Sequence, residues 1–378
     1  MPDEIQPFRI EVPDSVLTDL RERLARTRWP EPLDDPDWDY GIEQGSLREL
    51  AEAWQGAYDW RRHEAELNAW PQLRTRIDGH DFHVLHARSP HDGALPLILT
   101  HGWPGSIVEF LDVLGPLVDP PAHGGAAADA FHVVCPSLPG YGFSRPTNAK
   151  GWHPRRIGRA WAELMRRLGY RRYVAQGGDF GSVVSQFLAR EDPERCAALH
   201  LNFLFLPPPP GDLDEDGVAA AAAFRRYLAE EAAYAQLHAT KPETLGYALN
   251  DSPVGLLAWI AEKFRAWTDC RGVIEHAVSR DRLLTNVTLY WVTGSAPSAA
   301  RLYREARLAH ALAVPPRLAT PLGHARFPKE ILWSPRAWLE PWYDLQHWTD
   351  MPRGGHFAAL EQPALLVDDL RRFFARFR

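Results

Sequence analysis

A short glycine-rich segment, GGDFG at 177–181, constrains the fold of this chain more than any other feature. It joins the strand-like run YVAQ (173–176) directly to a helical pattern that continues to Arg190. Small residues two places before and two places after a central side chain allow a sharp turn that holds this side chain in a strained conformation at the end of a strand. The segment therefore has the form of a nucleophile elbow centred on Asp179. A glycine-rich turn in which Asp179 merely caps the helix is the structural alternative.

Strands and helices alternate on both sides of this elbow. Apolar runs typical of buried strands lie at 95–100, 131–140, 173–176 and 198–205, and a helical pattern covers about 155–168. This alternation predicts an α/β protein with a mostly parallel, doubly wound sheet. With the elbow at the end of a strand, the pattern is typical of the α/β-hydrolase fold.

The rhythm divides the chain into four expected segments. Residues 1–90 form an N-terminal extension that wraps the core, with helices expected at 16–26 and about 47–65 and a hairpin at 73–87. Residues 91–206 and 316–378 form the two parts of the α/β-hydrolase core, and the second part ends in a helix at 364–377. Between them, 207–315 is expected to be an inserted helical cap, with helices such as 219–236 and 254–267.

Composition excludes several classes of protein. A net charge of -7 repels nucleic acid and anionic membranes. No apolar run reaches the roughly 18 residues of a membrane span, and the first thirty residues contain no run of signal-peptide length. The three cysteines have no paired spacing, which argues against a disulfide framework and for a reducing compartment. We therefore expect a cytoplasmic protein without a membrane anchor and without nucleic acid as a partner.

An aspartate at the centre of the elbow determines which reactions are available. A carboxylate gains nothing by attacking an amide or an ordinary ester, because the product would be a more reactive anhydride. It can displace a leaving group at carbon, when a strained ring opens or a halide departs, and so form an alkyl-enzyme ester. Water must then cleave that ester, which requires a base, an acid that orients the base, and an oxyanion hole.

Candidates for these roles follow the chain order nucleophile, acid, base of this fold. His356, within RGGHF (353–357), comes after a strand-like run and before the last helix, where the base belongs. Glu330 follows the strand after the cap and leaves room for one helix and one strand before His356. Asp344 and Asp350 are rivals for the acid, but each leaves too little chain for both elements.

The segment HGWPG (101–105) follows the first buried strand of the core, and in this fold the corresponding loop supplies one N–H of the oxyanion hole. The residue after the nucleophile supplies the other. The expected donors are therefore the backbone amides of Trp103 and Phe180. His101 precedes the nucleophile in the chain and is expected to hold the loop rather than act as the base.

With these residues identified, the chain resembles the microsomal-type epoxide hydrolases, which carry an extended N-terminal segment before the hydrolase domain. The resemblance covers most of the chain and rests on HGWPGS (101–106), GYGFS (140–144), GGDFGS (177–182), TKPETLGYALNDSPVGLLAWIAEKF (240–264), LTNVTLYWVTG (284–294) and RGGHFAALEQP (353–363). It implies a small-molecule epoxide and water as reactants, Asp179 as nucleophile, His356 as base and Glu330 as acid. No cofactor and no metal are implied.

The resemblance also implies two cap tyrosines that bind the epoxide oxygen and donate a proton as the ring opens. Matched by local motif, these are Tyr234 and Tyr303, with Tyr227, Tyr247 and Tyr290 as alternatives. A phenol suits the role, because its ordinary pKa near about 10 keeps it protonated while still allowing transfer to a far more basic alkoxide.

Three other functions fit the sequence less well. A haloalkane dehalogenase shares the fold, the aspartate and the base, but it typically has a Trp after the nucleophile to hold the halide, and the Phe180 ring has no N–H. A catalytically silent, ligand-binding relative would not need the set of Asp179, Glu330 and His356. An esterase is disfavoured because no serine occupies the centre of an elbow.

The chain contains 15 Trp, and large rings of this kind can fill a core or line a pocket. Trp103, Phe180, Trp259 and Trp291 are the aromatic residues expected to line an apolar substrate pocket. The N-terminal extension adds apolar surface, so the sequence also leaves a homodimer open. The sequence does not identify the epoxide, which could be a xenobiotic, a hormone or a secondary metabolite.

Overall fold

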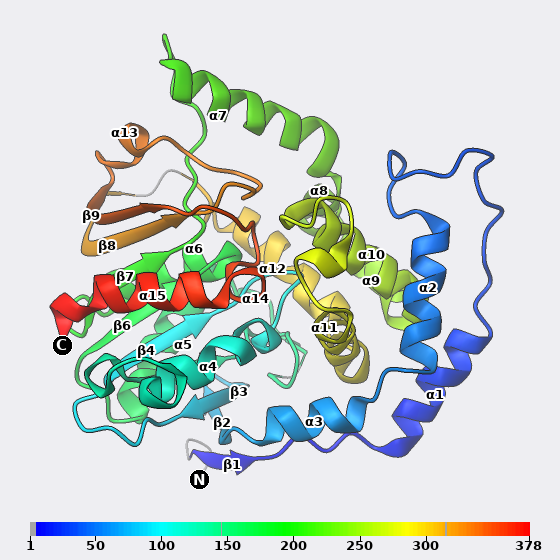
Figure 1. The fold of residues 1–378 in the computed structure, drawn as a ribbon, viewed down its shortest axis with the longest axis horizontal. Coiled ribbons are helices and arrows are strands. Elements are labelled where there is room, and N and C mark those ends of the chain that lie inside the picture. The colour runs from blue at the N-terminus through cyan, green and yellow to red at the C-terminus, as the bar shows by residue number, and fades with distance from the viewer. Residues whose placement is uncertain (1–4, 145, 314–315) are drawn as a thin grey trace.

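The computed structural model describes residues 5–144, 146–313 and 316–378. Its centre is one nine-stranded sheet in the order β1-β2-β3-β5-β4-β6-β7-β8-β9 (Figure 1). The strands are β1 Gln6–Phe8, β2 Gln72–Ile77, β3 His80–Ala87, β4 Leu95–Thr100, β5 Phe131–Pro136, β6 Tyr173–Gly177, β7 Cys196–Leu201, β8 Leu318–Arg326 and β9 Tyr343–Asp350. The strands β5, β4, β6, β7, β8 and β9 are parallel to one another, whereas β1, β2 and β3 pair antiparallel at one edge.

The central strands are nearly continuous runs of buried Val, Leu, Ile and Ala, because helices cover both faces of the sheet. On one face, α5 (Pro154–Arg167) packs against α6 (Asp179–Glu191). On the other, α4 (Leu111–Val118) packs against α15 (Pro363–Phe374), both at the front in Figure 1. This arrangement confirms the predicted α/β-hydrolase fold and leaves the ends of the parallel strands open for a site.

The segment between β7 and β8 is helical. It contains α7 (Glu215–Arg226), a π-helical turn (Tyr227–Glu231), α8 (Ala233–Thr240), α9 (Pro242–Asp251), α10 (Pro253–Trp267), α11 (Arg280–Thr293) and α12 (Ala296–Leu308). The single helix expected over 219–236 is wrong, because the π-turn interrupts it before Tyr234. The expected boundary between cap and core, at 315 and 316, touches residues 314–315, which lie outside the described part of the chain.

The N-terminal extension joins the core and the cap. Its strands β1, β2 and β3 belong to the central sheet, and the predicted 73–87 hairpin is β2 and β3. Its helices α1 (Asp14–Ala25), α2 (Gln44–Gln55) and α3 (Trp60–Asn68) lie along the cap helices α10 and α11 (Figure 1). One helix was expected over about 47–65, but Gly56 ends α2 and the side chain of Asp59 caps a new helix by accepting from the N–H of Arg61.

Buried hydrogen bonds attach the extension to the cap. The indole N–H of Trp54 donates to Thr288 Oγ1 at 2.8 Å, and the Tyr58 hydroxyl lies 3.1 Å from Thr285 Oγ1. The Arg282 guanidinium also forms an ion pair with Glu66 at 2.7 Å. Because Trp54, Tyr58 and their threonine partners are buried, separating the two elements would leave these polar atoms without partners, whereas the ion pair is partly exposed.

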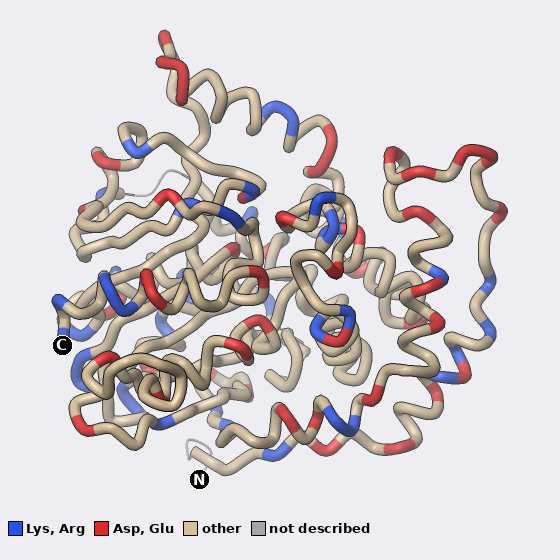
Figure 2. The backbone as a smooth tube through the Cα atoms, in the orientation of Figure 1, with Lys and Arg blue, Asp and Glu red and all other residues tan. Residues whose placement is uncertain are grey.

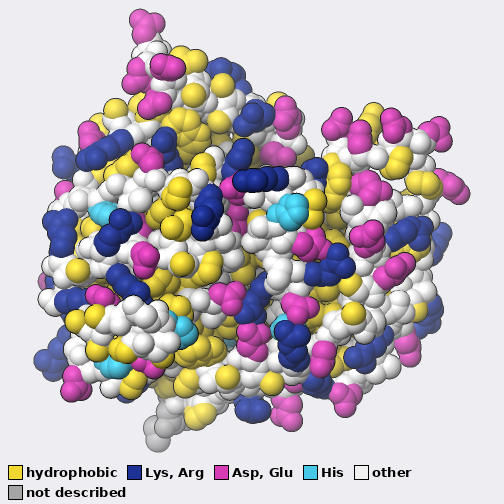
Figure 3. Space-filling view, in the orientation of Figure 1, with side chains coloured by type: hydrophobic (Ala, Val, Ile, Leu, Met, Phe, Trp, Pro, Cys, Tyr) yellow, Lys and Arg dark blue, Asp and Glu magenta, His cyan; other side chains and the backbone are white. Residues whose placement is uncertain are grey.

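The surface carries charges of both signs. Lys and Arg alternate with Asp and Glu along most elements, and acidic residues gather in the loop before α2 and at the start of α7 (Figure 2). The face in Figure 3 mixes both signs with smaller hydrophobic groups, one of which lies beneath α7. Among the described helices, none combines the length and the hydropathy that a bilayer crossing requires.

Candidate functional site

Asp179 lies at the junction of β6 and α6 with a left-handed backbone, φ +48°. Non-glycine residues rarely adopt this conformation, which is a common form of strain at reactive positions. The turn is possible because its neighbours have no side chains: a Cβ on Gly181 would collide with the Thr100 carbonyl, and one on Gly177 with the Gly181 carbonyl. The sequence pattern thus corresponds to an elbow that points the carboxylate of Asp179 away from the sheet.

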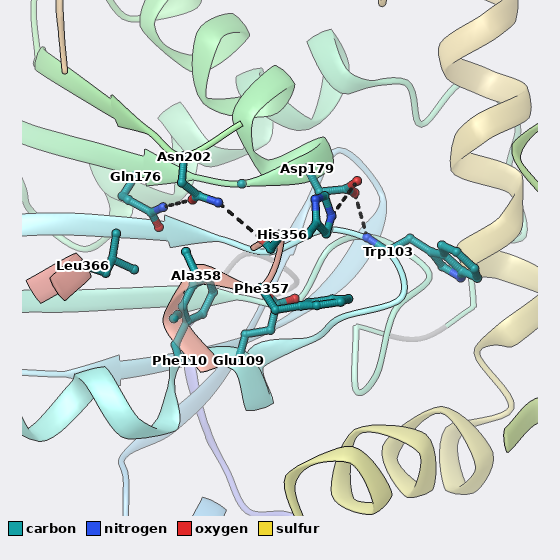
Figure 4. Close-up of a pocket in the computed structure, with 13 residues that line it drawn as sticks. Trp103, Glu109, Phe110, Gln176, Asp179, Asn202, His356, Phe357, Ala358 and Leu366 are labelled. Carbon is teal, nitrogen blue, oxygen red and sulfur yellow. Dashed lines mark hydrogen bonds and ion pairs between the residues drawn. The ribbon is translucent and has the colours of Figure 1, made fainter. Parts of the chain in front are cut away.

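His356 and Glu330 come to the same place from two different loops. Glu330 follows β8 and His356 follows β9, and a bridge between Lys329 and Gly355 holds the two loops side by side. His356 Nδ1 lies 2.6 Å from Glu330 Oε1. Its Nε2 lies 3.4 Å from Asp179 Oδ2, a contact that Figure 4 shows. The imidazole therefore links the two carboxylates, with one nitrogen facing each.

Opposing effects set the charge of His356. Burial favours the neutral imidazole, but the negative charge of Glu330 and the hydrogen bonds to Asp179 and Glu330 outweigh burial and raise the pKa of His356 well above its ordinary value. While Asp179 is ionised, His356 is thus held as an imidazolium between two carboxylates.

Glu330 is itself fixed in position. Its Oε1 also accepts the N–H of Ile331 at 2.8 Å, and its side chain is buried. The two rivals lie elsewhere: Asp350 pairs with Arg326 at the surface, and Asp344 accepts from the Gln346 amide. Among the three acidic residues considered, the described structure brings only Glu330 to His356.

The carboxylate of Asp179 also meets the loop after β4. The backbone N–H of Trp103 donates to Asp179 Oδ1 at 2.9 Å, and Gly102 lies so close to this carboxylate that a Cβ there would collide with it. The described structure records no corresponding bond from the N–H of Phe180. His101 holds the loop: its Nε2 accepts from the Leu138 N–H at 3.2 Å, and burial lowers its pKa to about 4, so it is neutral.

Three of the five tyrosines considered line a cavity together with Asp179: Tyr234, Tyr303 and Tyr227. Tyr234 on α8 and Tyr303 on α12 are buried with ring centroids 5.8 Å apart. Burial raises the pKa of both phenols well above 10, with smaller contributions from Tyr227 and Asp179 at Tyr234 and from Tyr234 and Asp179 at Tyr303, so both are protonated donors. Tyr290 instead donates to the Gly105 carbonyl, and Tyr247 is 80% exposed.

Tyr227, in the π-turn, has its hydroxyl 3.4 Å from that of Tyr234. It lines the same cavity as Tyr234 and Tyr303. In the sequence, the local motif favoured Tyr234 and left Tyr227 as an alternative.

A cavity of about 650 Å³ opens in front of Asp179 and the tyrosines. Its described lining is mainly aromatic and aliphatic, including Phe180, Phe203, Phe205, Leu206, Ile331 and Leu332. Of the four rings expected to line a pocket, Phe180 does so here. Trp103 lies beside it, stacked on Tyr234 with centroids 4.9 Å apart.

Trp259 and Trp291 are not among the described residues that line this cavity. The indole N–H of Trp259 donates to His238 Nε2 at 3.1 Å, behind Tyr234 and Tyr303. Trp291 lies beneath the guanidinium of Arg23 from the N-terminal extension, 5.8 Å from the ring centroid. Helical spacing identified both as large rings but could not show which face of α10 or α11 meets the cavity.

Sequence reasoning passed over three polar residues next to the nucleophile. Glu109, Gln176 and Asn202 line a second, small cavity together with Asp179 and His356 (Figure 4). A usable signal existed for Glu109, a carboxylate in the otherwise apolar run IVEF (107–110) directly after the oxyanion loop. Within the described residues, no group of three or more His, Cys, Asp or Glu side chains could hold a metal ion.

Comparison with known proteins identifies relatives along the whole chain. Residues 5–110 match the family described as "Epoxide hydrolase N terminus", and residues 96–240 match the alpha/beta hydrolase fold family. Epoxide hydrolase 1 of the pig is 37% identical over 98% of this chain and 88% of its own length. The epoxide hydrolase structure from Aspergillus niger is 34% identical, with a TM-score of 0.87 over 99% of this chain and 97% of that one. The juvenile hormone epoxide hydrolase structure from the silkworm Bombyx mori is 30% identical, with a TM-score of 0.86 over 100% of this chain and 94% of that one.

Proposed function

This chain belongs to the epoxide hydrolases of the α/β-hydrolase fold, enzymes that add water to an epoxide, and from this premise we propose that Asp179 is its nucleophile. The observation that carries the proposal is the position of the Asp179 carboxylate: it lines the apolar cavity together with Tyr234 and Tyr303, and His356 stands behind it. The same contacts indicate how the two halves of the reaction proceed.

In the first half, a carboxylate oxygen of Asp179 attacks a ring carbon of the epoxide. The carbon–oxygen bond of the ring breaks, and its electron pair stays on the ring oxygen. Tyr234 or Tyr303 donates a proton to that oxygen, which yields a hydroxyl group on the other carbon and an ester between Asp179 and the attacked carbon. Because burial keeps both phenols protonated, the donors are available at any pH at which the enzyme is folded and Asp179 is ionised.

In the second half, water cleaves the ester. Esterification removes the negative charge of Asp179, one of the interactions that raise the pKa of His356. The pKa of His356 then falls, so the imidazolium gives up a proton, which restores the tyrosine that donated to the ring oxygen. The neutral imidazole can then accept a proton from water, while Glu330 keeps the ring oriented. The N–H of Trp103 stabilises the negative charge that develops on the ester oxygen, and we expect the N–H of Phe180 to join it in that state.

The substrate we propose is an apolar epoxide. Support comes from the aromatic and aliphatic lining of the cavity and from its volume of about 650 Å³, within the range of sites that enclose a small organic molecule. We also propose a reducing compartment such as the cytoplasm, since the described Cys135, Cys196 and Cys270 are free and buried. The homodimer stays a prediction, to be tested by the mass in solution.

A single turnover in ¹⁸O-labelled water tests the role of Asp179, with the enzyme in excess over styrene oxide. If Asp179 attacks the ring, the diol of the first turnover carries only unlabelled oxygen, and the peptide that contains Asp179 gains one ¹⁸O atom. Asp179→Ala should produce neither diol nor labelled peptide. Label found in the diol of the first turnover would mean that water opens the ring directly, and the proposal would fail.

A further inference from the structure

Behind Asp179 lies a second cavity, which shares only this residue with the substrate cavity among the described residues that line each. It has about 10 Å³ of room for the centre of a water molecule, which corresponds to one water. His356 and Trp103 line it together with Asp179, so it adjoins the imidazole and the oxyanion loop (Figure 4). Because Asp179 lines both cavities, a molecule held here lies beside its side chain.

Gln176, the penultimate residue of β6, lines this cavity and is 1% exposed. Its amide nitrogen donates to Asn202 Oδ1 at 2.7 Å, and the Asn202 amide donates in turn to the His356 carbonyl at 3.5 Å. The amide oxygen of Gln176 has no hydrogen-bond partner among the described residues. A buried acceptor left unpaired costs about 1–3 kcal/mol, so this oxygen calls for a donor such as the O–H of water.

Glu109 approaches the same cavity from the turn after the oxyanion loop. Its carboxyl lies against the backbone of Gly105, where a Cβ would collide with it. Burial, together with the charge of Asp179 and against that of His356, raises the pKa of Glu109 to about 8. At neutral pH it is therefore a neutral carboxylic acid, which both donates and accepts a hydrogen bond. The Glu109 side chain is half-buried, and it lines the cavity.

We propose that this cavity binds the water that hydrolyses the alkyl-enzyme ester, with Glu109 and Gln176 as its positioning residues. The inference rests on the proposed role of Asp179. One O–H of the water points to His356 Nε2 and the other to Gln176 Oε1, while the Glu109 carboxyl fixes the water oxygen. Three polar partners of this kind are what an ordered buried water typically has.

Hydrolysis of the ester has two steps, addition of water and departure of the substrate oxygen, and neither needs a further reactant. The water oxygen bonds to the carboxyl carbon of Asp179, and His356 takes the proton released. The bond between that carbon and the substrate oxygen then breaks, and the departing oxygen takes the proton back from His356. Glu109 and Gln176 keep their own protons throughout, and their effect is to hold the water within reach of both the carbon and the imidazole.

Because the two cavities are separate, the proposal predicts different effects on ester formation and on ester hydrolysis. Alkylation takes place in the substrate cavity, where neither Glu109 nor Gln176 is among the described lining residues. Loss of either residue should therefore slow the hydrolysis of the ester and leave its formation nearly unchanged. A purely structural role would instead disturb both steps, because Asp179 lines both cavities.

Rapid-quench single turnovers with styrene oxide test this, using intact-protein mass to follow the alkyl-enzyme and chromatography to follow the diol. We expect Glu109→Leu and Gln176→Leu each to slow hydrolysis by about tenfold or more, the loss of roughly one hydrogen bond, with alkylation within about threefold of the wild type. The alkyl-enzyme should accumulate, and Glu109→Gln, which keeps a hydrogen-bonding group, should recover most of the rate.

Asp112→Asn is the matched control, because Asp112 is a carboxylate three residues along that pairs with Arg282 at the surface and does not line either cavity in the described structure. It should leave both rates unchanged. If one Leu variant fails to fold, as judged by circular dichroism, the other decides. Equal slowing of both steps, or no slowing of hydrolysis, would overturn the inference. Absence of any alkyl-enzyme even in His356→Ala would instead refute Asp179 as nucleophile.

Discussion

His356 Nδ1 lies 2.6 Å from Oε1 of Glu330, although the two residues are 26 positions apart in the chain. The contact depends on the bridge between Lys329 and Gly355, which sets the loops after β8 and β9 side by side. A histidine whose Nδ1–H donates to a buried carboxylate keeps its other nitrogen available for proton transfer. The pair therefore fixes both the direction of the imidazole and the site at which it exchanges protons.

Glu330→Gln should act mainly on the second half of the reaction. The neutral amide no longer stabilises the imidazolium, so we expect kcat to fall by about 10²–10⁴-fold while the alkyl-enzyme accumulates. Rapid-quench mass measurements check this. Asp350→Asn removes the rival acid, whose carboxylate pairs with Arg326 at the surface, and should leave kcat within about twofold. An equal loss in both variants would contradict the assignment of Glu330.

The two buried phenols should act mainly on the first half. Tyr234→Phe and Tyr303→Phe should each slow alkylation by about 10–10²-fold, and the double variant should lose more, because both proposed donors are then absent. Single-turnover formation of the alkyl-enzyme is the measurement. Tyr247→Phe, at a position 80% exposed on α9, is the control and should match the wild type. Full alkylation by the double variant would show that another group donates the proton.

The contribution of Glu361 to stability should fall as the pH rises between its ordinary pKa and its higher pKa in the folded protein. Burial raises the pKa of Glu361 to about 7, against the lowering effect of the N–H groups of Asp269 and Phe357. Between about pH 4.5 and 7 the folded protein binds a proton that the unfolded chain has released. This group therefore lowers the free energy of unfolding by about 1.4 kcal/mol for each pH unit gained in that range.

Glu361→Gln removes this titration, so in urea denaturation the difference in free energy of unfolding between variant and wild type should shift in favour of the variant as the pH rises across this range. Glu340→Gln, an exposed glutamate paired with Arg336, is the control and should leave the slope as it is. Parallel curves for wild type and Glu361→Gln would mean that Glu361 titrates near its ordinary pKa.

Gly181→Ala should prevent the elbow from forming. The added Cβ would collide with the Thr100 carbonyl, a backbone atom of β4 that cannot move without disturbing the sheet. We expect a loss of stability of about 1–3 kcal/mol or more together with loss of activity, measured by denaturation and diol formation. Gly56→Ala is the comparison: a Cβ there lies at 3.4 Å from its nearest neighbour, Glu52 O, so the change should be mild.

The sequence was most informative where short-range chemistry determines structure. The elbow could be predicted because its steric demand falls on a few adjacent residues. The hairpin at 73–87 could be predicted because Asp78-Gly79 is a strong turn signal. Chain order was enough to select Glu330 over Asp344 and Asp350, since each candidate leaves a different length for the intervening helix and strand.

Features that depend on packing were less accessible. The break between α2 and α3 depends on the cap formed by Asp59, and the π-turn before Tyr234 leaves the 3.6-residue periodicity of apolar residues almost unchanged. Helical spacing likewise could not show which side of its helix Trp259 or Trp291 presents to the cavity. Glu109 and Gln176 matter only because β6 and the turn after the oxyanion loop meet in three dimensions.

The hydrogen bonds that attach the N-terminal extension to the cap affect how the epoxide can enter and the diol can leave. Trp54 and Tyr58 bind α11, and no described residue of α11 or of the extension lines the substrate cavity. The cap is thus held to the extension at α11, and the cavity is lined by other elements. Swinging the whole cap outward would break these buried hydrogen bonds, so we expect epoxide and diol to exchange while α11 stays attached to the extension. The size of the passage into the cavity, and not a movement of the whole cap, should then decide how large an epoxide can enter.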